Sequence, residues 1–96
     1  MDNDQIVRVM RAYKMSPNEA RLTIFLATER RVVTVFEIAD FLGKREQANE
    51  NWFALNNYVK VLIHKLRRKI GKQMLANVWS IGYELTPNAE LLEVLK

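Results

Sequence analysis

Residues 56–70, NNYVKVLIHKLRRKI, decide the fold of this chain. When the stretch is turned by about 100° per residue, its apolar and polar side chains separate onto opposite sides. The apolar side, which includes the residue just before the stretch, holds Leu55, Val59, Leu62, Ile63, Leu66 and Ile70. The opposite side holds Asn57, Lys60, Val61, His64 and Arg68, with Lys65, Arg67 and Lys69 on the flanks. The pattern predicts an amphipathic helix with a basic, hydrogen-bonding outer face.

Charge of one sign covers that outer face. No acidic residue occurs between Asn51 and Val78. A helix whose Lys and Arg serve only solubility usually mixes signs, because Glu and Lys four residues apart stabilise each other. A one-signed face of about three turns is better suited to a polyanion than to plain solvent.

The composition fits a single globular domain. With 96 residues, 49% hydrophobic and 27% charged, the chain is long enough for one core and too short for two domains. The net charge of +4 favours anionic partners. The absence of cysteine excludes disulfides, thiolate zinc sites and a cysteine nucleophile. The first residues contain no long apolar run, so we expect neither a signal peptide nor a membrane span, and we expect a cytoplasmic location.

The first half of the chain is predicted to be helical. Residues 4–14 form a short amphipathic helix that could pair with a second copy or, as we prefer, cover the domain. Ser16 and Glu19 have the spacing of a capping box and predict a helix over 17–28. Its inward face is expected to hold Leu22, Phe25 and Leu26, with Ala20 and Ile24 near it.

A shorter helix is predicted over 35–42. Thr34 and Glu37 repeat the capping-box spacing, and Gly43 can take the left-handed conformation that ends a helix. Residues 32–33 just before it predict a brief extended segment, no more than an edge strand.

The segment before the main helix is the least readable. Residues 44–51 are mostly polar and predict a loop. Asn56 or Asn57 is expected to cap the main helix, although that helix could begin as early as Glu50.

A β-hairpin is predicted after the main helix. Residues 74–78 and 83–85 read as short strands around the turn 79–82, where Gly82 can supply a positive φ. Thr86-Pro87 could open a final short helix. That helix is expected to pack inward through Leu91, Leu92 and Leu95.

These elements define the expected fold class, which is mainly α with a small β-hairpin. We expect a winged helix-turn-helix with extra N-terminal and C-terminal helices. Residues 1–96 would form one domain, composed of an N-terminal helix (1–14), a winged-helix core (15–86) and a C-terminal helix (87–96).

Three segments carry a family resemblance. They are SPNEARLTIFLATERRVVTVFEIADFLG (16–43), NYVKVLIHKLRRKIG (57–71) and LANVWSIGYEL (75–85). In order and spacing they resemble the winged-helix DNA-binding effector domain of OmpR/PhoB-type response regulators, most strongly at LRRKI (66–70) and IGY (81–83).

The resemblance implies sequence-specific binding of double-stranded DNA, usually by paired or tandem copies. It implies that helix 56–70 enters the major groove and that hairpin 74–85 lies along the adjacent minor groove. It also implies contact between RNA polymerase and the loop before that helix. The candidate DNA-binding residues are Asn57, Lys60, Val61, His64, Lys65, Arg67, Arg68, Lys72 and Ser80.

The chain departs from the family pattern in several places. These residues include no receiver domain, so we expect a free-standing regulator without the family's phosphorylation switch. A predicted helix replaces the sheet that usually precedes the first helix of the domain. Lys60 stands where an acidic residue is common, and Ser80 stands where glycine is usual. Glu84 stands where a basic residue is frequent, and a carboxylate there would face phosphate unfavourably.

Specificity requires side chains that reach base edges. Arg67 or Arg68 could bind a guanine bidentately, Asn57 an adenine, and Val61 a thymine methyl group. His64 could bond to a base edge or a phosphate, and it has no nucleophile or orienting carboxylate that would make it a catalytic base. We therefore expect no enzyme, no metal site and no cofactor.

A second interpretation is a protein-interaction module that binds RNA polymerase or another regulator. Its candidate contacts are Trp52 and Phe53, which need burial either in the core or in a partner. Trp52 and Trp79 could also stack on bases, but we expect both as core or wing anchors.

Overall fold

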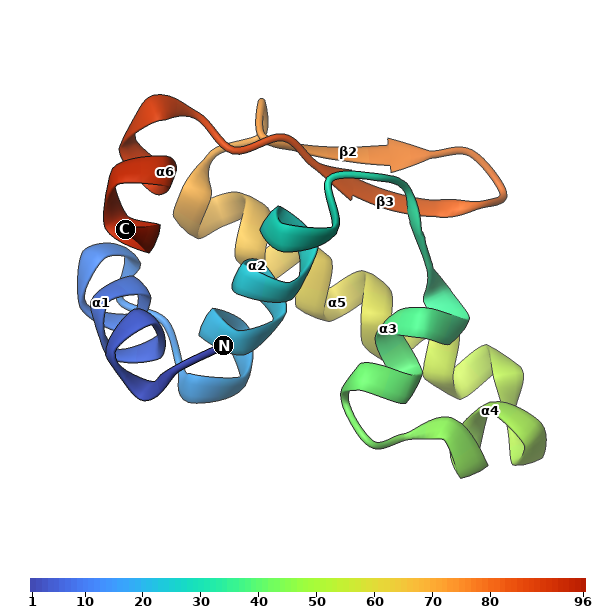
Figure 1. The fold of residues 1–96 in the computed structure, drawn as a ribbon. Helices are drawn as coiled ribbons and strands as arrows, with labels where there is room; N and C mark the ends of the chain where they lie inside the picture. Colours follow the sequence, from blue (N-terminus) through green and yellow to red (C-terminus); the bar gives the residue numbers. More distant parts are fainter.

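The computed structural model describes the backbone of residues 1–96 and the side chains of residues 1–46 and 50–96. The chain is mainly helical, with a small antiparallel sheet whose strand order is β1-β3-β2 (Figure 1). The elements are α1 (Asn3–Tyr13), α2 (Pro17–Glu29), β1 (Val33–Thr34), α3 (Val35–Phe41), α4 (Arg45–Glu50), α5 (Trp52–Ile70), β2 (Leu75–Val78), β3 (Gly82–Leu85) and α6 (Ala89–Leu95).

Helix α5 supplies the centre of the core. Its predicted apolar stripe is confirmed, because five of the six side chains are buried and Leu62 is half-buried. The five are Leu55, Val59, Ile63, Leu66 and Ile70. Helix α2 brings Leu22 and Leu26, both completely buried, to the core that holds the last four of these residues, whereas Leu55 packs with Ala39 of α3. Phe25 of α2 stacks on Phe41 of α3 with ring centroids 4.4 Å apart.

Both predicted capping boxes are confirmed. The Glu19 N–H donates to Ser16 Oγ at 3.2 Å, and the Ser16 N–H donates to Glu19 Oε1 at 2.9 Å. Thr34 and Glu37 exchange the same pair of bonds, each at 3.1 Å. A hydrogen bond from Arg31 is the main cause that lowers the pKa of Glu37 to about 2, and the backbone N–H of Thr34 adds to it. The carboxylate that caps α3 therefore stays ionised over a wide pH range.

The two terminal helices cover one end of the core. Ile6 and Val9 of α1 are buried, which confirms that this helix covers the domain. Gln5 Nε2 donates to the carbonyl of Leu95 at 3.0 Å, and Arg8 Nε donates to the carbonyl of Val94 at 2.9 Å. These bonds join α1 to α6, so the two ends of the chain lie side by side (Figure 1).

Helix α6 corrects the prediction for the last segment. It begins after Asn88, whose side chain accepts from the Leu91 N–H at 2.8 Å, and not at Thr86-Pro87. Leu91 is buried but Leu92 is 38% exposed, so the expected inward position of Leu92 is wrong. A helix of about two turns can bury only one narrow stripe, and adjacent residues point about 100° apart.

The stretch before α5 also differs from the prediction. Residues 45–50 form helix α4 rather than a loop, because Arg, Glu and Gln are good helix formers and α4 packs against α3 and α5. Helix α5 begins at Trp52, capped by the Asn51 side chain that accepts from the Ala54 N–H at 3.1 Å. The predicted caps Asn56 and Asn57 instead lie inside the helix.

The turn of the hairpin is built differently from the expectation. Ser80, not Gly82, takes the positive φ, at 63°. Gly82 lies in β3 opposite Thr34 of β1. A Cβ atom at position 82 would overlap the Val33 carbonyl oxygen and lie 2.8 Å from the Thr34 Cα. Glycine is therefore required here by the close approach of β1, not by the turn.

Replacing Gly82 by alanine should force β1 away from β3. We expect Gly82→Ala to lower the free energy of unfolding by at least about 2 kcal/mol. Gly43→Ala is the matched control, because Gly43 has a φ of 74° and open space where a Cβ would stand. That control should cost only about 1 kcal/mol. Urea denaturation followed by circular dichroism measures both values, and equal losses would contradict the close-approach account.

A half-buried ion pair joins α2 to α5. Lys69 Nζ donates to Glu19 Oε1 at 2.8 Å, and the Glu19 side chain is only 9% exposed. Burial works against ionisation of this carboxyl, but the hydrogen bonds from Lys69 and Ser16 outweigh it and lower the pKa of Glu19. Lys69 is thus part of the packing of α5 rather than of a free basic surface.

Lys69→Met should destabilise the protein, because it leaves the Glu19 carboxylate without its charged partner. We expect a loss of about 1–3 kcal/mol at pH 7 in urea denaturation. Lys65→Met, one turn earlier and exposed, should cost nearly nothing. Since the folded-state pKa of Glu19 is lowered, the difference between the variants is present above its ordinary value of 4.5 and shrinks as the pH falls below it. Equal stability of the two variants would show that the ion pair contributes nothing.

Candidate nucleic-acid interface

The outward face of α5 is exposed to solvent. The six predicted groove or phosphate residues on this face are exposed, and they are Asn57, Lys60, Val61, His64, Lys65 and Arg68. The aliphatic side chain among them, Val61, is 47% exposed. The burial of the apolar stripe causes this exposure, since residues on the opposite side of the helix cannot also reach the core.

Arg67 is the predicted residue that the structure places differently. It is half-buried, and its Nε donates to the carbonyl oxygen of Leu75 in β2 at 2.9 Å. The bond fastens the start of the hairpin to α5. Arg67 therefore has a structural role, and only its terminal nitrogens are left for another partner.

Lys72 and Ser80, the two predicted residues outside α5, are both exposed. Lys72 is exposed just after Gly71, the residue that ends α5. Ser80 is exposed at the tip of the hairpin. Among the described residues the acid-free stretch from Asn51 to Val78 thus forms α5, the connection after it and β2.

The early start of α5 extends its outward face. Phe53 lies four residues before Asn57 and is 85% exposed. Trp52 is 41% exposed and stacks on Phe36 of α3, with ring centroids 5.5 Å apart. The sequence predicted that Trp52 and Phe53 are buried either in the core or in a partner. Neither is buried in the core, so burial in a partner is the remaining prediction.

Tyr58 was not singled out by the sequence. Lys44 Nζ lies 4.9 Å from the centre of the Tyr58 ring, in the geometry of a cation–π contact. The contact joins the segment before α4 to the exposed side of α5. Nothing in the local sequence pairs these residues, because their approach depends on the path of α4.

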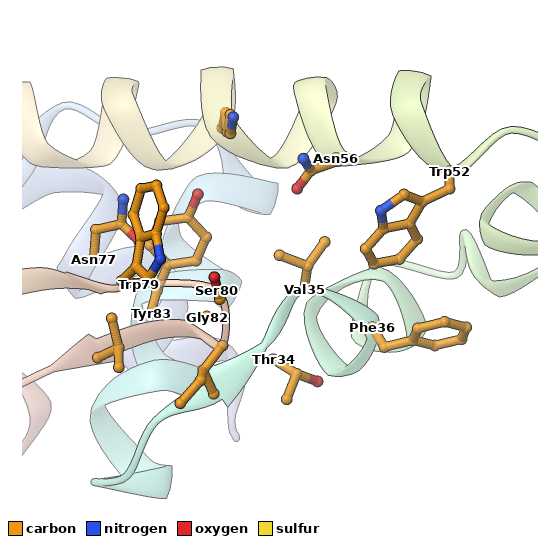
Figure 2. Close-up of a pocket in the computed structure, with 13 residues that line it drawn as sticks. Thr34, Val35, Phe36, Trp52, Asn56, Asn77, Trp79, Ser80, Gly82 and Tyr83 are labelled. Atoms are coloured by element: carbon orange, nitrogen blue, oxygen red, sulfur yellow. The ribbon is translucent and has the colours of Figure 1, made fainter.

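A groove separates α5 from the hairpin tip. It has a volume of about 600 Å³. One side of the groove is formed by Trp52, Asn56 and Lys60, which lie four residues apart along one face of α5. The other side is formed by the hairpin tip. Figure 2 shows the Trp52 indole pointing from α5 toward Val35, and the Trp79 indole extending from the hairpin in the direction of α5. Lys60 belongs both to this groove and to the outward face, so the two surfaces are continuous.

The acidic residue of the hairpin lies away from that groove. Gly82 and Tyr83 line the groove, whereas Glu84 lines a separate hollow with Arg30 and Pro87. Glu84 directly follows Tyr83 in β3, and the side chains of successive strand residues point to opposite faces of the sheet. The carboxylate that counted against a DNA-binding wing therefore does not face the basic helix.

The side chains that the structure describes show no group of three His, Asp or Glu residues placed to hold a metal ion. In the same part of the chain, no helix has the length and apolar character needed to cross a membrane. The chemistry of this surface is that of cations, amides and exposed apolar groups.

Comparison with known proteins agrees with this architecture. The family described as "Transcriptional regulatory protein, C terminal" matches residues 10–85, from the end of α1 through β3. No curated protein and no solved structure was found to match the chain. The family match covers the whole of α5, its supporting helices and the hairpin. The chain therefore belongs to this family, the OmpR/PhoB-type C-terminal domain of DNA-binding transcription regulators.

Proposed function

We propose that this protein is a cytoplasmic transcription regulator that binds specific sequences of double-stranded DNA. Helix α5 would lie in the major groove, and the hairpin formed by β2 and β3 would act as the wing. The observation that carries the proposal is the exposed, acid-free face of α5 beside a hairpin whose carboxylate points elsewhere. A B-form major groove is wide enough to admit a single helix presented in this way.

The exposed residues divide into two roles. Lys60, Lys65 and Lys72 can neutralise phosphates, and this supplies affinity that falls steeply as salt is added. Arg68 can bind a guanine bidentately and Asn57 an adenine, while Val61 offers an apolar contact to a thymine methyl group. His64 can bond to a base edge or to a phosphate. Arg67 would add at most its terminal nitrogens, because its Nε is bonded to Leu75. Ser80 would meet the backbone from the wing.

Paired binding remains a prediction. The apolar face of α1 is occupied within the chain by Ile6 and Val9, so a homodimer through α1 would use other residues of that helix, such as the 39% exposed Val7. Two copies bound to a two-fold or tandem site would show as a repeated motif in selected DNA.

Selection of bound duplexes from a random pool tests the proposal, and variants of α5 then test its residues. We expect Arg68→Ala to lose about 1–3 kcal/mol of discrimination at one base pair. Lys60→Ala should weaken binding to all duplexes and lower the salt slope by about 1. Arg11→Ala, an exposed cation on α1, is the control and should bind as the parent does. No enriched motif, or a salt response unchanged by Lys60→Ala, would reject the proposal.

A second candidate function is docking to RNA polymerase. The exposed aromatic surface formed by Phe36, Trp52 and Phe53 favours it, because clustered exposed aromatics are typical of protein interfaces. The start of α5, which carries Trp52 and Phe53, lies beside α3 and α4, at the opposite end of the helix from Arg67 and Arg68 (Figure 1).

Purified RNA polymerase and nuclease-treated regulator test this second function. We expect Phe53→Ala to weaken capture of the polymerase at least about 10-fold, as loss of an interface hot spot does. Leu92→Ala, an exposed apolar residue on α6, is the matched control. Capture that Phe53→Ala and Leu92→Ala leave equally strong would remove this surface as the docking site.

A further inference from the structure

The hairpin tip exposes two large apolar side chains. Trp79 is 86% exposed and Ile81 is 55% exposed. Ser80 between them takes a left-handed conformation with a φ of 63°. The sequence predicted Trp79 to be a core or wing anchor, and this prediction is wrong because its side chain is exposed. Exposed apolar groups that stand together usually mark a contact with another molecule.

The tip is apolar and uncharged. Residues 77–83, which form the tip and its flanks, contain neither Lys nor Arg. A wing that holds DNA by its phosphates needs cations at this point. What this tip offers instead is an indole, a branched alkyl group and one hydroxyl, and such groups fit base edges and base faces.

The tip is also held rigidly. The Ile81 N–H donates to the Val78 carbonyl at 3.0 Å, closing the turn. The strands behind it pair Val78 with Gly82 and Asn77 with Tyr83, and β1 adds a third strand against β3. Arg67 fastens the far end of β2 to α5. The hairpin that carries Trp79 is thus fixed, at the end opposite its tip, to α5, the helix proposed to lie in the major groove.

We propose that Trp79 and Ile81 form an apolar wedge that enters the minor groove beside the site bound by α5 and kinks the duplex there. The inference rests on the proposed binding of double-stranded DNA. Apolar side chains inserted at a base step partly unstack it and bend the helix away from the wedge. Unstacking is offset when the bent duplex contacts more protein, and here the groove between α5 and the tip supplies that surface.

The basic surface of α5 beside the uncharged tip favours DNA over a protein as the partner of the tip. Lys60 lines the same groove as Trp79, and no acidic residue occurs among residues 51–78. Glu84, the acidic residue of β3, lines another hollow. A duplex held along α5 would bring its backbone across the groove, and the tip would meet the next groove of the DNA.

The wedge predicts a bend that depends on Trp79. A duplex carrying the selected motif, labelled at its ends for energy transfer, should bend by at least about 20° on binding the parent protein. Trp79→Ala should remove most of that bend and lower the affinity roughly 5- to 100-fold. 2-Aminopurine placed next to the motif should brighten with the parent protein and stay quenched with Trp79→Ala, since its fluorescence rises on unstacking. The indole touches little of the protein, so we expect this variant to fold normally, which circular dichroism checks.

Two further variants separate a wedge from a simple contact. Trp79→Lys adds a phosphate-binding cation, so it should recover affinity at low salt without recovering the bend. Leu92→Ala, an exposed apolar residue far from the tip, should leave both bend and affinity unchanged. If duplexes bind and Trp79→Ala bends them as the parent does, the wedge is wrong and the proposed function stands. If no duplex binds at all, both are wrong.

Discussion

Burial of one stripe of α5 is the constraint on which the rest of the structure depends. Leu55, Val59 and Ile63 are almost fully enclosed, and Leu66 and Ile70 continue the stripe to the end of the helix. A helix that commits one side so completely must turn its other side outward. The core and the exposed basic face are therefore two results of a single sequence periodicity, and a change that rotated α5 would disturb both together.

The basic residues of α5 are not equivalent, although the sequence presents them as one cluster. Arg67 bonds to the backbone of β2, and Lys69 pairs with the buried Glu19 of α2. Arg68, between them, points into solvent. Within this run of cations, Arg67 and Lys69 therefore stabilise the packing of the protein, while Arg68 is exposed on its surface. The roles differ because neighbouring residues of a helix face different directions. Counting charges in such a run overstates the number available to a polyanion.

Much of the fold could be predicted from local patterns, and the rest depended on contacts between distant segments. Helices α2, α3 and α5 carry strong periodicity or capping signals, and these act within a few residues. Helix α4 has no apolar stripe, so its sequence resembles a polar loop. The role of Gly82 depends on β1, nearly fifty residues earlier in the chain, and Lys69 finds Glu19 at a separation of 50 residues. For the candidate site, exposure of the α5 face followed from its periodicity, whereas the groove and the position of Arg67 required the hairpin to be in place.

Thr34 gives the architecture a mechanical property. This residue pairs with Gly82 of the hairpin, and its hydroxyl also accepts the Glu37 N–H at 3.1 Å at the start of α3. Strand and helix meet there with no linker between them. A force on the hairpin therefore reaches α3 through one peptide unit, and from α3 it reaches the Phe36–Trp52 stack at the beginning of α5. The hairpin and the start of the long helix are thus joined by a short path of direct contacts that passes through this threonine.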